Sequence, residues 1–123
     1  MPSVDVYVRN LADRTVITVV GDLDFDACPQ VSEVTDAVNV RGRTLCLDLV
    51  RVTFMDASGL GLLQTLNRNA DAHGGHLELS GLQAQPLHVL DLTGTRAQFH
   101  MTTPRPPGPR DPAVLLPVQH AAS

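Results

Sequence analysis

The sequence predicts an α/β fold, a mostly parallel mixed β-sheet of about four to five strands packed with about three to four α-helices. Three observations lead to this fold class. Runs of β-branched or apolar residues, each of strand length, alternate along the chain with segments whose apolar residues recur every three or four positions. Glycines and other turn residues separate these segments. At 123 residues, the chain is also long enough for one domain with a substantial core.

The N-terminal segments predict a β-hairpin followed by a helix. Residues 5–9 alternate between polar and apolar side chains, residues 15–20 are almost all β-branched, and residues 10–14 supply the turn between them. Residues 25–40 place apolar side chains at helical spacing, with Pro29 in the first turn, where a helix tolerates proline. This segment is therefore the first predicted amphipathic helix.

A central strand and a second helix are predicted next. Residues 44–50 form a nearly continuous apolar run, which is typical of a strand covered on both faces. From Ser58 onward, apolar residues recur every three or four positions until Gly74 and Gly75 break the pattern. The second helix is therefore expected to begin near Ser58 and to end before these two glycines.

The rest of the domain adds two strands and a third helix. Residues 76–82 predict a strand, and residues 83–93 predict a helix with Pro86 in its first turn and Gly94 at its end. Residues 96–101 predict a final short strand. The element order is then β-β-α-β-α-β-α-β, which favours a sheet layered with helices over a helical bundle.

The distribution of proline divides the chain into a domain and a tail. Residues 102–123 contain six of the nine prolines, which disfavour both helices and central strands. We therefore expect a folded domain at residues 1–101 and a Pro-rich, flexible C-terminal tail at residues 102–123. A PxxP match at residues 106–109 is too weak to predict a ligand for an SH3-type domain.

Composition and charge exclude several classes of partner. The formal net charge is −4, the chain has no lysine, and aromatic residues make up only 3%, so we expect no nucleic-acid partner. The N-terminus lacks the features of a signal peptide, and no apolar run is long enough to span a bilayer, so we expect a cytoplasmic protein with no membrane partner. Cys28 and Cys46 fit neither a redox pair nor a zinc framework, which favours buried free thiols.

Residues 54–63, FMDASGLGLL, combine a carboxylate, a hydroxyl and two glycines, so they are the first place to look for chemistry. Ser58 lacks the Gly-x-Ser-x-Gly spacing of a nucleophile elbow. Residues 59–61 lack the third glycine of a dinucleotide-binding fingerprint, and His73 and His76 have no third zinc ligand at a suitable spacing. We therefore predict that the protein is not an enzyme and has no catalytic residue, no metal site and no cofactor.

Helix capping explains only part of this motif. Asp56 and Ser58 are good N-cap residue types, because their side-chain oxygens accept the unpaired N–H groups of a first helical turn at about 1 kcal/mol each. Gly59 and Gly61, in contrast, each cost up to about 1 kcal/mol relative to alanine inside a helix. The glycines therefore favour a backbone that is exposed or closely approached by another group.

Four segments of the chain form a pattern that is found in a known family. They are Gly-Asp-Leu-Asp at residues 21–24, the central strand at residues 45–49, the FMDASGLGLL motif at residues 54–63, and Leu-Asp-Leu-Thr-Gly at residues 90–94. In this order, they resemble the STAS domain of the bacterial anti-sigma factor antagonist family. The resemblance extends over about the first hundred residues.

The resemblance implies a STAS fold and a regulator of transcription that binds a serine-kinase anti-sigma factor and so releases a sigma factor. It further implies that the kinase phosphorylates a hydroxyl at the start of the second helix, which releases the antagonist until a serine phosphatase removes the phosphate. The phosphate adds about −1.5 to −2 charges, which are repulsive beside carboxylates in a packed interface. The partner-binding residues implied in this way are Asp22, Asp24, Asp56, Ala57, Ser58, Gly59, Leu60 and Gly61.

The sequence departs from the family at the usual phosphoacceptor. That residue is generally the first hydroxyl of an Asp-Ser-Ser/Thr-Gly run, and here the position is Ala57, so Ser58 is the candidate phosphorylation site. Two alternatives follow: Ser58 accepts the phosphate, or Ser58 only caps the helix and the antagonist is not switched. Asp24 likewise either caps the first helix or lies on the partner-binding surface. The alternative function is a phosphorylation-independent STAS accessory or scaffold module of a transport or stress-signalling assembly.

Overall fold

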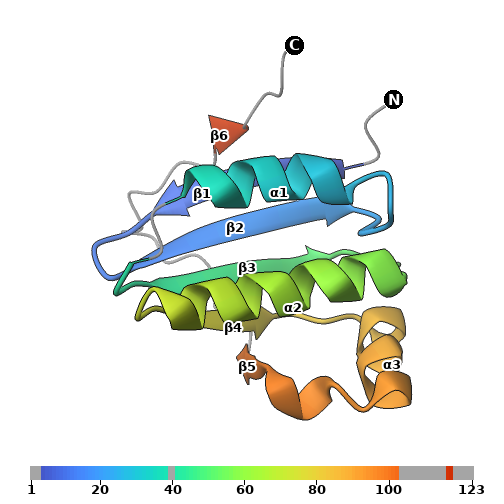
Figure 1. Cartoon of the computed structure of the whole chain (residues 1–123). Helices are drawn as coiled ribbons and strands as arrows, with labels where there is room; N and C mark the ends of the chain where they lie inside the picture. The colour runs from blue at the N-terminus through green and yellow to red at the C-terminus, as the bar shows by residue number, and fades with distance from the viewer. Residues whose placement is uncertain (1–3, 39–40, 103–115, 118–123) are drawn as a thin grey trace.

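The computed structural model describes residues 4–38, 41–102 and 116–117. It has the predicted α/β architecture, a mixed sheet with the strand order β5-β4-β3-β2-β1-β6 and helices packed against it (Figure 1). The elements in chain order are β1 (Val4–Asn10), β2 (Arg14–Gly21), α1 (Cys28–Ala37), β3 (Thr44–Arg51), α2 (Ala57–Ala72), β4 (His76–Ser80), α3 (Ala84–Thr93), the 3-10 helix η1 (Arg96–Gln98), β5 (His100–Thr102) and β6 (Leu116–Pro117). The predicted fold class is therefore confirmed.

The strand pairings fix where the connecting loops lie. β1 and β2 pair antiparallel from Val4↔Gly21 to Asn10↔Thr15, which confirms the predicted hairpin. β2, β3, β4 and β5 pair parallel to one another in this order. Because parallel strands all end at the same edge of a sheet, the loops that follow β2 and β3 meet there, at the right-hand end of Figure 1.

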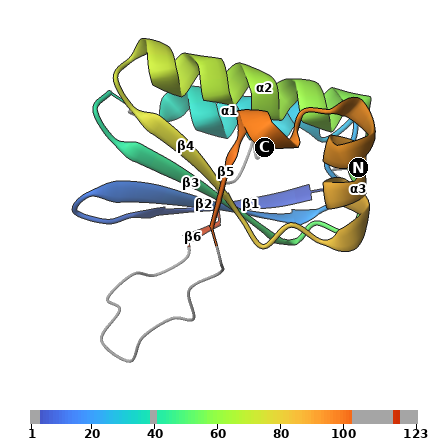
Figure 2. The same ribbon diagram turned by 90° about the horizontal axis from the view of Figure 1, so that it is seen from below.

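The described helices α1 and α2 lie on the same face of the sheet (Figure 2). The parallel strands are added in one direction across the sheet, and right-handed crossovers then place successive helices on one side. Side chains of β3 consequently alternate: Leu45, Leu47 and Leu49 are buried, whereas Cys46 and Asp48 are partly exposed. The prediction that residues 44–50 are covered on both faces was wrong, because both crossover helices pack on the leucine side.

The start of one helix and the start of one strand depart from the sequence prediction. α1 begins at Cys28, with Pro29 in its first turn as predicted, because a hydrogen-bonded turn closed by the Asp24 carbonyl oxygen precedes it. The strand predicted from residue 96 was wrong in its first half. Residues 96–98 form η1 with all three side chains exposed, so no strand alternation is present there, and the strand begins only at His100.

The core lies between the sheet and the two crossover helices. Its side chains are almost all aliphatic, as a chain with few aromatic residues requires, and α3 closes one end of the sheet (Figure 2). α3 ends at Gly94, whose φ of 69° is the left-handed conformation that glycine adopts most readily, which confirms the predicted helix stop. The largest fully buried side chains are Ile17, Leu23, Leu45, Leu47, Leu49, Met55, Leu63, Leu77, Leu79, Leu90, Val19 and Val31.

The boundary between domain and tail stays a prediction. Two residues of the predicted tail form β6, which pairs antiparallel with β1 through Val8↔Leu116 and Tyr7↔Pro117. Thr102, the first residue of the predicted tail, is the last residue of β5. The remaining tail residues, 103–115 and 118–123, include the PxxP match at residues 106–109 and lie outside the described residues.

Candidate functional site

The loops that follow β2 and β3 are joined through their backbones at the carboxyl edge of the sheet. Leu23 and Met55 form an isolated parallel bridge. The Leu23 N–H donates to the Phe54 carbonyl oxygen at 2.9 Å, and the Asp56 N–H donates to the Leu23 carbonyl oxygen at 3.4 Å. The predicted motifs at residues 21–24 and 54–63 are therefore brought together, where α1 and α2 begin (Figure 1).

Asp56 lies at the centre of this junction. It is the N-cap of α2: its Oδ1 accepts hydrogen bonds from the Ser58 N–H at 2.9 Å and the Gly59 N–H at 3.1 Å. Its Oδ2 accepts from the Phe25 N–H at 3.2 Å, across the junction. One carboxylate therefore caps α2 and fixes the loop after β2, and the predicted capping role of Asp56 is confirmed.

Ala57 and Ser58 are the first two residues of α2. Ala57 is exposed and Ser58 is partly exposed. Because Asp56 is the N-cap, the alternative in which Ser58 caps α2 was wrong. Within the described ranges, the Ser58 hydroxyl has no hydrogen-bond partner.

The two glycines of the motif occupy opposite environments. Gly59 is buried, and a Cβ there would collide with the Leu23 carbonyl oxygen and lie 2.6 Å from Met55 Cγ. Gly61 is partly exposed, and a Cβ there would have no neighbour within 4 Å. Leu60, between them, is only 7% exposed and belongs to the core. The predicted close approach to the backbone therefore applies to Gly59 alone.

The two acidic residues predicted in the loop after β2 differ in their contacts. Asp24 is partly exposed, and its Oδ1 accepts a hydrogen bond from the Ala27 N–H at 3.0 Å, just before the first residue of α1. Asp22 is exposed. Asp24 thus fixes the turn that precedes α1, but Ala27 is the N-cap and no side chain caps the helix, so the predicted capping role of Asp24 was wrong.

Sequence reasoning missed two aromatic side chains at this site. Phe25 is 73% exposed and Phe54 is 42% exposed. The Phe54 carbonyl oxygen belongs to the backbone pairing that joins the loops, and the Phe25 N–H donates to the Asp56 side chain across the junction. Asp26, also exposed, follows Phe25 directly. The available signal was an aromatic residue between two aspartates just before a proline-marked helix start, but Phe25 was assigned to the helix by its periodicity.

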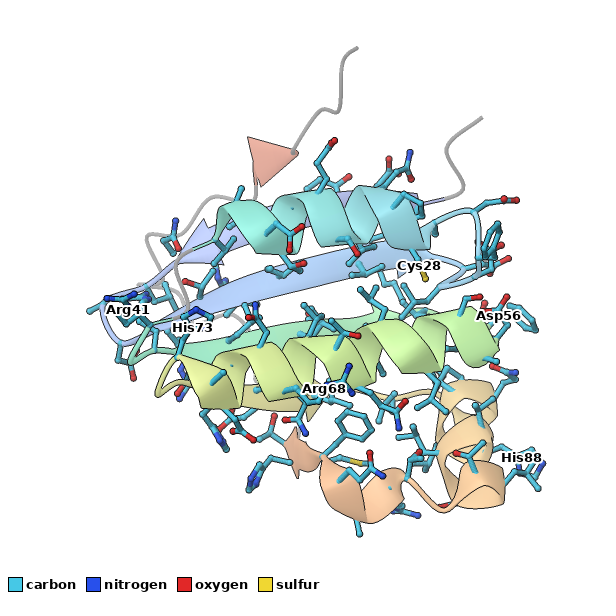
Figure 3. All side chains as sticks on the ribbon, in the orientation of Figure 1. Cys28, Arg41, Asp56, Arg68, His73 and His88 are labelled. Atoms are coloured by element: carbon cyan, nitrogen blue, oxygen red, sulfur yellow. The ribbon has the colours of Figure 1, made fainter. Side chains whose placement is uncertain are left out.

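A cysteine also lies at this junction (Figure 3). Cys28, the first residue of α1, is partly buried. Burial raises the pKa of its thiol above the ordinary value, and the negative charges of Asp56 and Asp24 raise the pKa further. The thiol is therefore held in its neutral form beside two carboxylates, and nothing in the local sequence around Cys28 indicates this placement.

The start of α3 holds the loop after β3 from the other side. The Met55 N–H donates to Gln85 Oε1 at 2.8 Å, and Gln85 Nε2 donates to the Met55 carbonyl oxygen at 3.1 Å. Gln83 Nε2 donates to the Val50 carbonyl oxygen at 2.6 Å. The Gln85 amide thus pairs with both backbone groups of Met55, as a neighbouring strand would, and the sequence did not reveal this role.

The histidines that were weighed as metal ligands lie elsewhere. His73 is the C-cap of α2, at the opposite end of the helix, and its Nδ1 lies 2.8 Å from the Asn69 carbonyl oxygen (Figure 3). His76, in β4, lies 3.4 Å from Glu78 and stacks at 4.3 Å against His100. Among the described residues, no group of three or more potential ligands is placed to hold a metal ion. No helix in the described ranges is long and apolar enough to cross a bilayer.

Comparison with known families and relatives gives a consistent result. Residues 7–101 match the family model described as "Mlab, STAS domain". The anti-sigma-B factor antagonist of Listeria monocytogenes is 29% identical over 93 residues, which cover 75% of this chain and 81% of the relative. The anti-sigma-B factor antagonist of Bacillus subtilis is 24% identical over 94 residues, which cover 76% of this chain and 86% of the relative.

Solved structures show the same fold. An anti-sigma factor antagonist from Mycobacterium paratuberculosis superposes with a TM-score of 0.71 at 22% identity, covering 80% of this chain and 85% of that chain. The anti-sigma factor antagonist SpoIIAA in its unphosphorylated form superposes with a TM-score of 0.64 at 23% identity. The superposition covers 80% of this chain and 88% of that chain.

Proposed function

This chain belongs to the STAS domain family, and we propose that it acts as an anti-sigma factor antagonist, which binds a serine-kinase anti-sigma factor and thereby releases a sigma factor. Its relatives are anti-sigma factor antagonists, which supports the general role. The observation that carries the proposal is the junction at Asp56. There, one carboxylate fixes two loops and caps a helix whose first turn carries a partly exposed serine.

Within this proposal, the predicted partner-binding residues divide into two groups. Asp22, Asp24, Asp56, Ala57, Ser58 and Gly61 are exposed or partly exposed and are proposed to face the anti-sigma factor. Gly59 and Leu60 are buried, so we assign them the role of shaping this surface rather than contacting the partner.

Ser58 is the proposed phosphorylation site. A phosphate there would add about −1.5 to −2 charges beside Asp56 and close to Asp24, so it would weaken binding to a partner that already faces these carboxylates. The N-terminal turn of α2 would tolerate the phosphate within the domain, because helix N–H groups and the helix dipole favour negative charge. A serine phosphatase would restore the binding form.

The test is a calorimetric titration of the chain with the kinase-type anti-sigma factors of its source genome. We expect one of them to bind, and we expect Ser58→Asp to weaken that complex by more than about 1 kcal/mol. Asn69→Asp is the matched control, because it adds one negative charge to the same helix about 16 Å away. Equal affinities of the two variants for the anti-sigma factor would show that Ser58 does not lie in the interface.

Mass spectrometry after incubation with the same kinase and ATP tests the switch itself. A phosphate on Ser58 that is absent from Ser58→Ala is the expected result. Binding without any phosphate on Ser58 would establish an antagonist that is not switched.

A phosphorylation-independent accessory or scaffold role in a transport or stress-signalling assembly is the second candidate. Ala57 favours it, because the residue directly after the capping aspartate carries no hydroxyl. The gene neighbourhood separates the two candidates. A kinase-type anti-sigma factor or phosphatase gene beside this one supports the antagonist, and a transporter operon supports the accessory module.

A further inference from the structure

We infer that the partner docks on this protein by placing an apolar recess, bordered by basic side chains, over an exposed aromatic and acidic rim. The rim consists of Asp22, Asp24, Phe25, Asp26 and Phe54, around the junction at Asp56. This inference rests on the proposed function, and it adds the aromatic anchors and the chemistry that the anti-sigma factor must present to them.

Burial within the domain does not explain Phe25, and it explains Phe54 only in part. Phe25 is 73% exposed and Phe54 is 42% exposed, whereas Phe99, the third phenylalanine of the chain, is 8% exposed in the core. A phenylalanine gains roughly 1.5–3 kcal/mol when it is fully buried, and Phe25 gains little of this within the domain. Exposed aromatic side chains at a loop junction are typical of residues that contribute most to a protein–protein interface.

The rim is also held in place before any partner binds. The Phe25 N–H is fixed by Asp56 Oδ2 at 3.2 Å, and the Phe54 carbonyl oxygen accepts from the Leu23 N–H at 2.9 Å. Gln85 fixes the next residue, Met55, through two further hydrogen bonds. A surface whose backbone is already ordered loses less conformational entropy on binding, which favours tight association.

The charge of the rim determines the partner's charge. None of its three carboxylates, nor that of Asp56, forms an ion pair with a cation in the part of the chain that the structure describes. Burial raises the pKa of the Cys28 thiol, and the negative charges of Asp56 and Asp24 raise this pKa further. Complementarity therefore calls for arginine or lysine around the recess that receives the phenylalanines.

The same charges argue against other occupants. A second copy of the chain, docked rim to rim, would bring two sets of carboxylates together without compensating cations. Nucleic acid and anionic lipid surfaces are repelled for the same reason. A basic protein surface with an apolar recess remains the occupant that fits both the aromatic and the acidic side chains.

The test uses the full-length chain and the anti-sigma factor that binds it in the calorimetric titration. Phe25→Ala is compared with Leu92→Ala, in which the removed side chain is 72% exposed on α3 against 73% for Phe25. We expect Phe25→Ala to weaken the complex at least about tenfold and Leu92→Ala to change it less than about twofold.

Salt dependence tests the acidic part of the rim separately. Asp26→Asn is expected to weaken binding and to flatten its dependence on salt concentration, whereas Asp36→Asn, on the exposed surface of α1, is expected to change neither. Phe25→Ala is expected to leave the salt dependence unchanged.

The possible failures are distinguishable. If none of the kinase-type anti-sigma factors of the source genome binds the unmodified chain, both the proposed function and this inference are wrong. If one binds, but Phe25→Ala behaves like Leu92→Ala, or Asp26→Asn like Asp36→Asn, the antagonist function stands and the rim is overturned as its docking surface. Circular dichroism of each variant confirms that the fold is retained, which the exposure of all four side chains leads us to expect.

Discussion

The floor and the rim of the junction are built from neighbouring residues but are subject to different constraints. The floor, defined as Leu23, Met55, Gly59 and Gln85, is packed or hydrogen-bonded within the domain: Leu23 is 0% and Met55 1% exposed, and Gln85 bonds both backbone groups of Met55. The rim residues lie one to three positions from Leu23 or Met55 in sequence and are exposed or partly exposed.

This difference implies that, within one junction, some residues determine the stability of the domain and others determine its binding to a partner. Substitutions in the floor should lower the free energy of unfolding. Substitutions in the rim, apart from those of Asp24, whose carboxylate also bonds the turn before α1, should leave it nearly unchanged and alter only the affinity for a partner. The following changes, in order of decreasing expected effect, test whether the two properties are in fact separate.

Gly59→Ala should have the largest effect on stability. Its Cβ would collide with the Leu23 carbonyl oxygen and with the Met55 side chain, and such overpacking costs about 1–3 kcal/mol, here at the upper end because one of the colliding atoms is backbone. Gly61→Ala is the matched control. It has open space around its Cβ and should stabilise α2 by about 0.5–1 kcal/mol. Urea unfolding measures both, and equal effects would refute the assignment of Gly59 to the floor.

Gln85→Ala should destabilise the domain by about 2 kcal/mol, because it leaves the N–H and carbonyl groups of the buried Met55 without their partner. Gln64→Ala removes a glutamine amide that bonds only the exposed Gln98 side chain, so its effect should stay within about 0.5 kcal/mol. Thermal unfolding followed by circular dichroism compares the two. A Gln85→Ala variant as stable as Gln64→Ala would show that α3 does not hold the loop.

Asp56→Ala should cost about 1 kcal/mol of stability through the lost cap of α2. Asp56→Asn keeps an oxygen for the same N–H groups and should recover most of this loss. Because asparagine carries no charge, this variant should nevertheless bind a basic partner more weakly. Unfolding of the two variants measures what Asp56 contributes to stability, and titration with the partner measures what its charge contributes to binding. Equal stability of Asp56→Ala and Asp56→Asn would argue against the capping role.

The smallest expected effect is on the ionisation of Cys28. Burial, and then the charges of Asp56 and Asp24, raise the pKa of this thiol, so in a Cys46→Ser background its alkylation should need a higher pH than that of a free thiol. The raised pKa stabilises the fold below the ordinary thiol pKa of about 8.5, and this contribution is lost as pH rises through the pKa of the folded state. Cys28→Ala should remove that part of the pH dependence, and an alkylation profile like that of a free thiol would contradict the buried, acidic environment.

Local patterns in the sequence predicted most of the fold, and the errors have physical causes. The hairpin, the parallel strands and the ends of α2 and α3 follow from periodicity, glycine and proline alone. The one-sided burial of β3 was hidden because Cys46, on the exposed face, is itself apolar and makes the run look continuous. η1 was missed because residues 96–98 were assigned to the same short strand as residues 99–101, and three residues are too few to show a helical period.

The candidate site was predicted only where its residues lie in the two short motifs at residues 21–24 and 54–63. Asp56 as a cap could be predicted, because its partners are two and three residues ahead. Phe25 and Gln85 could not, because each is brought to the junction by a hydrogen bond to a residue about thirty positions away in sequence. Such contacts depend on strand order, which no local pattern specifies.

Release of a sigma factor tests the account most directly. A fluorescently labelled sigma factor is bound to its kinase-type anti-sigma factor, and the full-length chain is added while fluorescence anisotropy is recorded. We expect the unmodified chain to release the sigma factor, Leu92→Ala to do so at the same concentration, and Phe25→Ala to need at least about ten times more. A sigma factor that stays bound at saturating concentrations of the unmodified chain would contradict the proposed function.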